Sequence, residues 1–190
     1  MVKIVTKLMT ENDCYKAGRT IVTRGITIHS TAEPGIRAAD WFDLWNKPAS
    51  EQNGREVCVH AFLDDAGVMQ YLPWDMRGWH AGGSDNNDHI GTFYSSYRTP
   101  HMAYWTEFDI VGYDAAAQQP YFDQIWQNAV ELCVFLIGQF PTISVDEIVS
   151  HREGFARGTA SGHMDPEHWW QFHNRTMDDF RAAVRAALHP

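Results

Sequence analysis

The sequence predicts a single α/β domain in which a central mixed β-sheet is flanked by helices. Segments rich in β-branched or alternating apolar residues, which are typical of strands, are interleaved with segments of helical periodicity. The chain of 190 residues has the usual length of one domain, and neither an internal repeat nor a low-complexity linker divides it. We therefore expect residues 1–190 to form one domain.

The first half of the chain is predicted to supply a strand, a helix and a hairpin. The β-branched residues of 20–28 predict a strand, with Gly25 as a candidate bulge. Apolar residues at helical spacing predict a helix over residues 36–45. Alternating apolar residues in 56–63 predict a strand, which returns through residues 68–72 after a turn.

The second half begins with a loop and is richer in helix. Residues 74–88 contain many Gly, Asn and Asp and predict a loop, and residues 104–111 predict one further strand. The longest helical pattern covers residues 120–140 and is expected to pack across the sheet. A short strand over 143–149 and a terminal helix over 176–188 complete the predicted order.

Composition excludes several classes of partner and site. The net charge of −9 argues against nucleic acid or an anionic membrane as a partner. The three cysteines are isolated, so neither a disulfide framework nor a zinc ribbon is expected. No run approaches eighteen apolar residues, which argues against a membrane span. The N-terminus lacks the apolar core of a signal peptide, so we expect synthesis in the cytoplasm without export by that route.

Two histidines and a carboxylate form a candidate metal site. His29 ends a predicted strand, and His151 follows another. His163 and Asp165 lie two residues apart, so an extended backbone directs both side chains to the same side. A catalytic zinc site needs three protein ligands and one open position, which His29, His151 and Asp165 can provide. Each histidine taken alone fits a structural core residue equally well, so the prediction rests on their joint arrangement.

Aromatic residues are candidates for the walls of a cleft. They make up 13% of the chain, with eight Trp, and such residues often line sites for extended polar ligands. His80 lies between glycines in residues 78–83, which lets a ligand approach the backbone. We expect Trp74, Trp79 and His80 to contact substrate, with Trp105 as a further candidate, although each Trp singly is more typical of a core.

Several motifs occur in an order that resembles a known family. They are Ile28-His29-Ser30-Thr31-Ala32, His60-Ala61-Phe62-Leu63-Asp64-Asp65, Gly67-Val68-Met69-Gln70, Gly78-Trp79-His80-Ala81-Gly82-Gly83, Asn86-Asn87-Asp88-His89-Ile90-Gly91 and the segment from His151 to Pro166. Together they resemble the zinc-dependent N-acetylmuramoyl-L-alanine amidases, which are related to peptidoglycan recognition proteins and are common in phage endolysins. The segment 151–170 is especially similar to an endolysin-like branch, and the resemblance covers roughly the whole chain.

The resemblance implies a fold, a metal and a substrate. The fold would be that of the peptidoglycan recognition proteins, and one Zn²⁺ would be held by His29, His151 and Asp165. His163 falls where many members carry a Lys that helps to stabilise the transition state. The partner would be bacterial peptidoglycan, cleaved between N-acetylmuramic acid and L-alanine. The protein would then act on the cell wall after release by a holin-type or other route that needs no signal peptide.

One position departs from the family pattern. The family usually has an acidic residue or Tyr on a central strand, in a sequence such as Ile-Gly-x-Glu, but here Ile90-Gly91 is followed by Thr92-Phe93. We interpret residues 95–101 as an insertion and predict that Glu107, on the strand 104–111, supplies the carboxylate as general base. The rival placement gives that role to Tyr94 or Tyr97.

Two other functional classes remain as alternatives. One is a peptidoglycan-binding module without catalysis, although the presence of all three ligand types argues against it. The other is a different zinc hydrolase of wall peptides, and the chain has no H-E-x-x-H motif to support a zincin.

Overall fold

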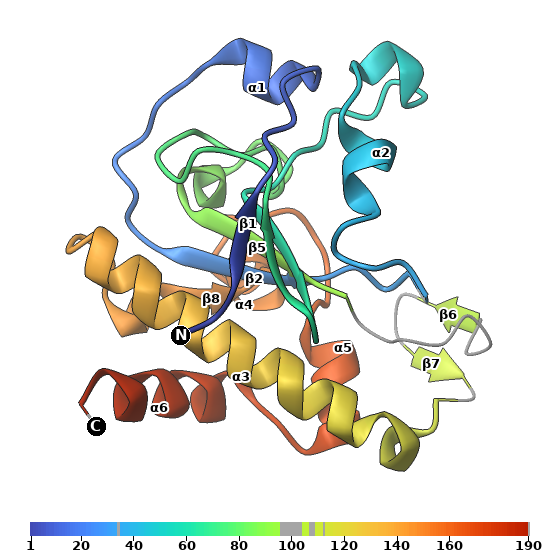
Figure 1. The fold of residues 1–190 in the computed structure, drawn as a ribbon, viewed down its shortest axis with the longest axis vertical. Coiled ribbons are helices and arrows are strands. Elements are labelled where there is room, and N and C mark those ends of the chain that lie inside the picture. The colour runs from blue at the N-terminus through green and yellow to red at the C-terminus, as the bar shows by residue number, and fades with distance from the viewer. Residues whose placement is uncertain (34, 96–103, 107–108, 112, 190) are drawn as a thin grey trace.

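A mixed sheet of six strands forms the centre of the computed structural model, which describes residues 1–33, 35–95, 104–106, 109–111 and 113–189 (Figure 1). The strand order is β1 (Ile4–Thr6), β4 (Gly67–Gln70), β3 (Ala61–Asp64), β5 (Ile90–Tyr94), β2 (Ile26–Ser30) and β8 (Ile148–Ser150). The hairpin pair β3–β4 is antiparallel, and the other neighbours are parallel. The predicted mixed sheet and hairpin are therefore confirmed.

Helices lie on both sides of the sheet. The long helix α3 (Ala115–Gln139) and the terminal helix α6 (Met177–Leu188) run together along one face, whereas α1 (Asp13–Ala17) and α2 (Trp41–Trp45) lie on the other side (Figure 1). The short helices α4 (His151–Ala156) and α5 (Glu167–Trp170) follow β8. Single 3₁₀ turns occupy Ala49–Glu51, Asp85–Asp88, Val145–Glu147 and Gln171–His173. No helix in the described part of the chain combines the length and apolar character that crossing a membrane requires.

The sheet separates two cores because successive side chains of a strand point to opposite faces. Ile26 and Ile28 of β2 pack into the core beneath α3, which also contains Cys133. On the opposite face, Phe62 packs with aromatic side chains of α2, in a core that includes Cys14 and Cys58. His29 alternates with Ile28 and therefore lies on the face opposite α3.

Four predicted elements are shorter in the structure than the sequence patterns indicate. The strands expected over 56–63 and 143–149 are observed as Ala61–Asp64 and Ile148–Ser150. The helix expected over 36–45 begins only at Trp41, because the backbone N–H of Arg37 donates to Asp40 and that of Ala38 donates to Asp64. The strand expected over 20–28 begins at Ile26, since Thr20 forms only an isolated bridge with Met76. At the start of the predicted helix, hydrogen bonds to side chains therefore replace the regular backbone hydrogen bonds.

The prediction of one continuous strand over residues 104–111 is wrong. Instead, β6 (Tyr104–Thr106) and β7 (Asp109–Val111) pair with each other as an antiparallel two-stranded sheet. Neither strand can pair with β2, because β5 and β8 already occupy its two edges. Glu107 lies outside the described residues, and its assignment as general base stays a prediction.

Candidate metal centre

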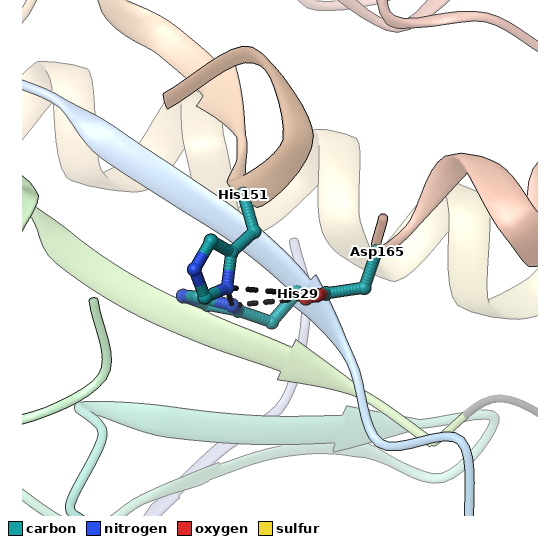
Figure 2. A group of neighbouring side chains, drawn as sticks. All are labelled: His29, His151 and Asp165. Atoms are coloured by element: carbon teal, nitrogen blue, oxygen red, sulfur yellow. Dashed lines mark hydrogen bonds and ion pairs between the residues drawn. The ribbon is translucent and has the colours of Figure 1, made fainter. Parts of the chain in front are cut away.

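Parallel strands bring the two histidines to the same edge of the sheet. His29 is the fourth residue of β2, and His151 directly follows β8 as the first residue of α4. Since β2 and β8 are parallel neighbours, their carboxyl ends lie side by side. Asp165 approaches from the segment between α4 and α5, and Figure 2 shows the three side chains converging. This edge is where open α/β sheets commonly place their ligands.

The three predicted metal ligands lie within direct contact of one another. His29 Nδ1 is 3.0 Å from Asp165 Oδ2 and 3.0 Å from His151 Nδ1, and His151 Nδ1 is 3.5 Å from Asp165 Oδ1. One donor atom from each residue lies within 4.8 Å of the others. The residues are 0%, 4% and 9% exposed in the order His29, His151, Asp165. The structure therefore joins residues that are up to 136 positions apart in the chain.

The protonation states of the cluster suit a cation. Burial, together with the neighbouring His29, lowers the pKa of His151 to about 3, so its imidazole is neutral near pH 7. Burial acts to raise the pKa of the Asp165 carboxyl, but the contact with His29 outweighs this effect and leaves that pKa below its usual value. A neutral imidazole and a carboxylate are both good ligands for Zn²⁺. The mixed nitrogen and oxygen donors, with one side open to a cavity, fit a catalytic zinc site better than a structural one.

His151 and Asp165 line a cavity of about 380 Å³, and His29 is fully buried next to them. Three further residues predicted for the site, Trp79, His80 and His163, line this cavity. Trp74 lies elsewhere, with its ring stacked on that of His60 at 6.4 Å between centroids. The cavity thus contains two of the three predicted substrate contacts.

The exposed His163 lies next to the cluster. Its ring centroid is 4.7 Å from that of His151, and the two ring planes are tilted by 44°. The two-residue spacing predicted that His163 and Asp165 point to the same side, and both residues line the same cavity.

Several residues of the cavity were not predicted. They lie on loops, on β5 or on α5, and their approach depends on tertiary structure: Glu33, Arg55, Glu56, Val57, Phe93, Ser161 and His168. Phe93 carried a signal in the sequence, as the fourth residue of Ile90-Gly91-Thr92-Phe93. It pairs with His29 across the strands, and its ring lies flat against the imidazole, with 4.3 Å between centroids and 6° between planes. Phe93 thus occupies the strand position that the family pattern gives to an acid.

The structure argues against Tyr94 as the alternative general base. Tyr94 follows Phe93 in β5, so its side chain points to the opposite face of the sheet. It is 1% exposed and its ring stacks with Trp170 at 6.1 Å between centroids, in the core beneath α3. Tyr97, the other alternative, lies outside the described residues.

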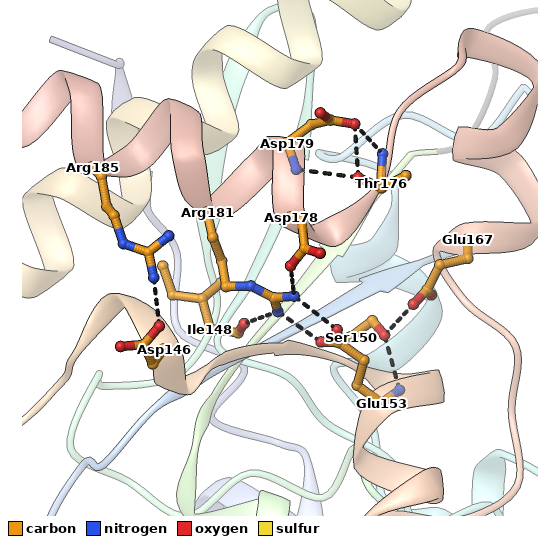
Figure 3. Close-up of polar contacts among 10 residues, drawn as sticks. All are labelled: Asp146, Ile148, Ser150, Glu153, Glu167, Thr176, Asp178, Asp179, Arg181 and Arg185. Atoms are coloured by element: carbon orange, nitrogen blue, oxygen red, sulfur yellow. Dashed lines mark hydrogen bonds and ion pairs between the residues drawn. The ribbon is translucent and has the colours of Figure 1, made fainter.

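A polar network that includes Ser150, Glu153, Glu167 and Arg181 holds the backbone at the start of α4 (Figure 3). Ser150 Oγ accepts a 2.9 Å hydrogen bond from Glu153 N and donates to Glu167, while Ser150 N donates to the Glu153 carboxylate at 3.1 Å. Arg181 of α6 donates to both oxygens of Glu153, at 2.9 and 3.0 Å, and to the carbonyl of Ile148. Ser150 immediately precedes His151, so this network fixes the start of α4.

The same network reaches the carboxylate ligand. Glu167 lies two residues after Asp165, and its hydrogen bond with Ser150 joins the two ligand segments. The backbone N–H of Arg152 adds a bond of 3.3 Å to the carbonyl of Asp165. Burial raises the pKa of Glu167 to about 7. The positions of His151 and Asp165 are therefore coupled through one hydrogen-bonded network.

Comparison with solved structures shows which proteins share this fold. The fold is shared with PlyL at 20% identity and a TM-score of 0.65, over 96% of this chain and 96% of that chain. It is similar to a mutant endolysin from Bacillus subtilis at 21% identity and 0.66, over 97% and 99%. It is also similar to the hydrolase AmiA from Staphylococcus aureus at 18% identity and 0.68, over 98% and 83%.

The sequence of this chain also matches a known protein family. Residues 18–168 match the model of the N-acetylmuramoyl-L-alanine amidase family. The chain therefore belongs to the N-acetylmuramoyl-L-alanine amidases. No curated protein sequence matches the chain.

Proposed function

We propose that this protein is a zinc-dependent amidase that hydrolyses the bond between N-acetylmuramic acid and L-alanine in bacterial peptidoglycan. The observation that carries the proposal is the buried cluster of His29, His151 and Asp165, of which His151 and Asp165 line a cavity. Family membership and the fold shared with endolysins support the choice of substrate. Action on the cell wall follows from that substrate.

The cluster suits amide hydrolysis because two of its three residues, His151 and Asp165, line the cavity. A bound zinc ion supplies a Lewis acid that polarises a carbonyl and makes water nucleophilic near neutral pH. The imidazoles of His29 and His151 and the carboxylate of Asp165 would hold that ion. His163, beside His151, would donate a hydrogen bond to the oxyanion that forms during attack on the amide.

Proton transfer requires a further group, for which we propose Glu107. A general base takes the proton from water and passes it to the leaving amine, and it typically contributes about 10²- to 10⁴-fold to the rate. Within the described residues, Glu33 and Glu56 are the carboxylates other than Asp165 that line the cavity. Either of them becomes the candidate if Glu107 does not fill the role.

Mass spectrometry of fragments released from defined peptidoglycan tests the reaction. The amidase reaction releases stem peptides that begin with a free L-alanine amine and leaves the glycan strands uncut. New reducing ends, or new amines within the stem peptide, would instead identify glycan or peptide cleavage and reject the proposal. Binding of intact walls without any release would identify a recognition module.

Metal dependence is measured on the same preparation. One equivalent of zinc is expected per chain, a chelator should stop the reaction, and added Zn²⁺ should restore it. Glu107→Gln should retain zinc and lose most turnover, with Glu33→Gln and Glu56→Gln as matched controls. Near-parental turnover in Glu107→Gln, with loss in one of the controls, would move the general base to that control position.

A further inference from the structure

His80 occupies a closely fitted place behind the metal cluster. Its ring lies between two glycines, and a Cβ built at Gly78 or Gly91 would stand 2.5 or 2.6 Å from His80 Cδ2. Any side chain at either position would displace the ring. Because the imidazole is also only 6% exposed, it has one available orientation.

Both ring nitrogens of His80 have partners in the protein. Nε2 lies 3.2 Å from the carbonyl oxygen of His89, and Nδ1 lies 3.0 Å from Nε2 of His29. A carbonyl oxygen can only accept a hydrogen bond, so Nε2 of His80 must carry the hydrogen. With the hydrogen on Nε2, the lone pair of His80 Nδ1 is directed at Nε2 of His29.

This arrangement matches the tautomer that His29 needs as a metal ligand. Nδ1 of His29 is the atom that lies 3.0 Å from both Asp165 and His151. A histidine that binds a metal through Nδ1 keeps its hydrogen on Nε2, where Nδ1 of His80 can accept it. We propose that His80 is a positioning residue, which accepts the hydrogen bond from His29 Nε2 and thereby keeps the Nδ1 lone pair of His29 directed at the metal position.

The loop that carries His80 also supports the other histidine ligand. His151 Nε2 lies 3.1 Å from Ser161 Oγ, and the backbone N–H of Ser161 donates to the carbonyl of Ala81 at 3.2 Å. A Cβ at Gly82 would stand 2.5 Å from Cβ of Ser161, so glycine is needed for this approach. Residues 80–82 therefore support the Nε2 atoms of both proposed histidine ligands, that of His29 directly and that of His151 through Ser161.

Asn87 holds this loop in place. Its Oδ1 accepts hydrogen bonds from the backbone N–H groups of His80, at 3.0 Å, and Ala81, at 2.7 Å. The loop is thus fixed independently of the cluster that it supports. Outer partners of this kind fix the orientation of a ligating imidazole and typically change metal affinity by about 10- to 100-fold. The inference rests on the proposed function only in taking the cluster as a metal site.

The tautomers can be observed directly in the parent protein. Nitrogen NMR of imidazole rings in the zinc-loaded protein, at a pH of about 8 where an ordinary imidazole is neutral, distinguishes the two neutral forms. We expect His80 and His29 both to carry their hydrogen on Nε2. A hydrogen on Nδ1 of either residue would overturn the inference, whatever any variant does.

Zinc affinity, measured by competition with a chelator, tests the consequence. His80→Leu removes the acceptor and should weaken zinc binding by about 10- to 100-fold. His80→Asn offers an oxygen near the position of Nδ1 and should recover most of the affinity. Equal zinc binding by His80→Leu and the parent protein would reject the positioning role.

His60 supplies the matched control. It is also fully buried and hydrogen-bonded at both nitrogens, to Gly91 N and the Met76 carbonyl, and its ring lies 6.1 Å from that of His80. His60→Leu should change zinc affinity by less than about threefold, and a loss equal to that of His80→Leu would show a general packing effect and reject the inference. A parent protein that binds no zinc would reject the proposed metal site, whereas a parent that binds zinc with the hydrogen of His80 on Nδ1 would reject the role of His80 alone.

Discussion

The two histidines of the cluster are held in position by different kinds of contact. His29 lies within β2, where strands on both sides hold its backbone and Phe93 covers its ring. His151 begins a short helix outside the sheet, and side-chain hydrogen bonds from Ser150, Glu153 and Arg181 hold its position. A strand ligand is therefore fixed by the fold as a whole, whereas the helix ligand depends on a few polar side chains. The two should respond differently to mutations nearby.

Removal of the strand ligand itself should have the largest effect. His29→Ala should lose zinc binding and wall lysis together, because two remaining ligands cannot hold a catalytic zinc site. Elemental analysis of the purified variant measures zinc per chain, and circular dichroism checks the fold. Full zinc stoichiometry in a folded His29→Ala protein would exclude His29 from the site.

The network around His151 can be broken at a distance from the metal. Arg181→Met keeps much of the apolar stem but removes the bonds to Glu153 and Ile148, and it should lower the free energy of unfolding by about 2 kcal/mol. Zinc affinity should fall as well, because the start of α4 loses its support. Denaturant unfolding and chelator competition measure the two effects.

Arg185 provides the control one helical turn further along α6. Its pair with Asp146 is exposed, at 50% and 80% of the side chains, against 12% and 28% for Arg181 and Glu153. Arg185→Met should therefore change stability by less than about 1 kcal/mol and leave zinc affinity unchanged. Equal effects of the two substitutions would contradict the importance of the buried network.

Two helix caps allow a sharper test. Ser150 and Thr176 each form a capping box, for α4 and α6 respectively, and only the first precedes a metal-binding residue. Substitution of either by Ala should cost about 1 kcal/mol of stability. Only Ser150→Ala should also weaken zinc binding, since it breaks the bond to Glu167 as well. A matching loss of zinc affinity in Thr176→Ala would remove the distinction.

The smallest effect is expected beside the strand ligand. Phe93→Leu removes the ring that lies on His29 and should cost about 1 kcal/mol of stability. Zinc affinity should change by less than about threefold, because the backbone of β2 still orients His29. A larger loss of affinity than in Ser150→Ala would reverse the comparison between the two ligands.

The sequence predicted the cluster of His29, His151 and Asp165. A histidine at the end of each of two predicted strands and a carboxylate on the loop after the second indicated this group, and the family resemblance implied the same three residues. The roles of His80 and Ser161 could not be found in this way. Their contacts depend on Gly78, Gly82 and Gly91, which let distant backbone segments approach closely.

The fold was also predicted in part. Period-two alternation identified the hairpin of β3 and β4, but it cannot identify the partner of a strand. The segment 104–111 was predicted as one strand, whereas β6 and β7 are two short strands that pair with each other. Trp74 shows the same difficulty for a side chain, because its ring stacks on buried His60 and lies away from the cavity.

The buried cysteines make unfolding of the two faces separately observable. Cys14 and Cys58 lie in the core on the metal side of the sheet, and Cys133 lies beneath α3, each at most 1% exposed. Burial raises the pKa of the Cys133 thiol, and it does the same for Cys58, so both resist alkylating reagents in the folded protein. Pulsed alkylation followed by peptide mapping would therefore record which side of the sheet opens first. The native thiols can report local opening without any introduced label.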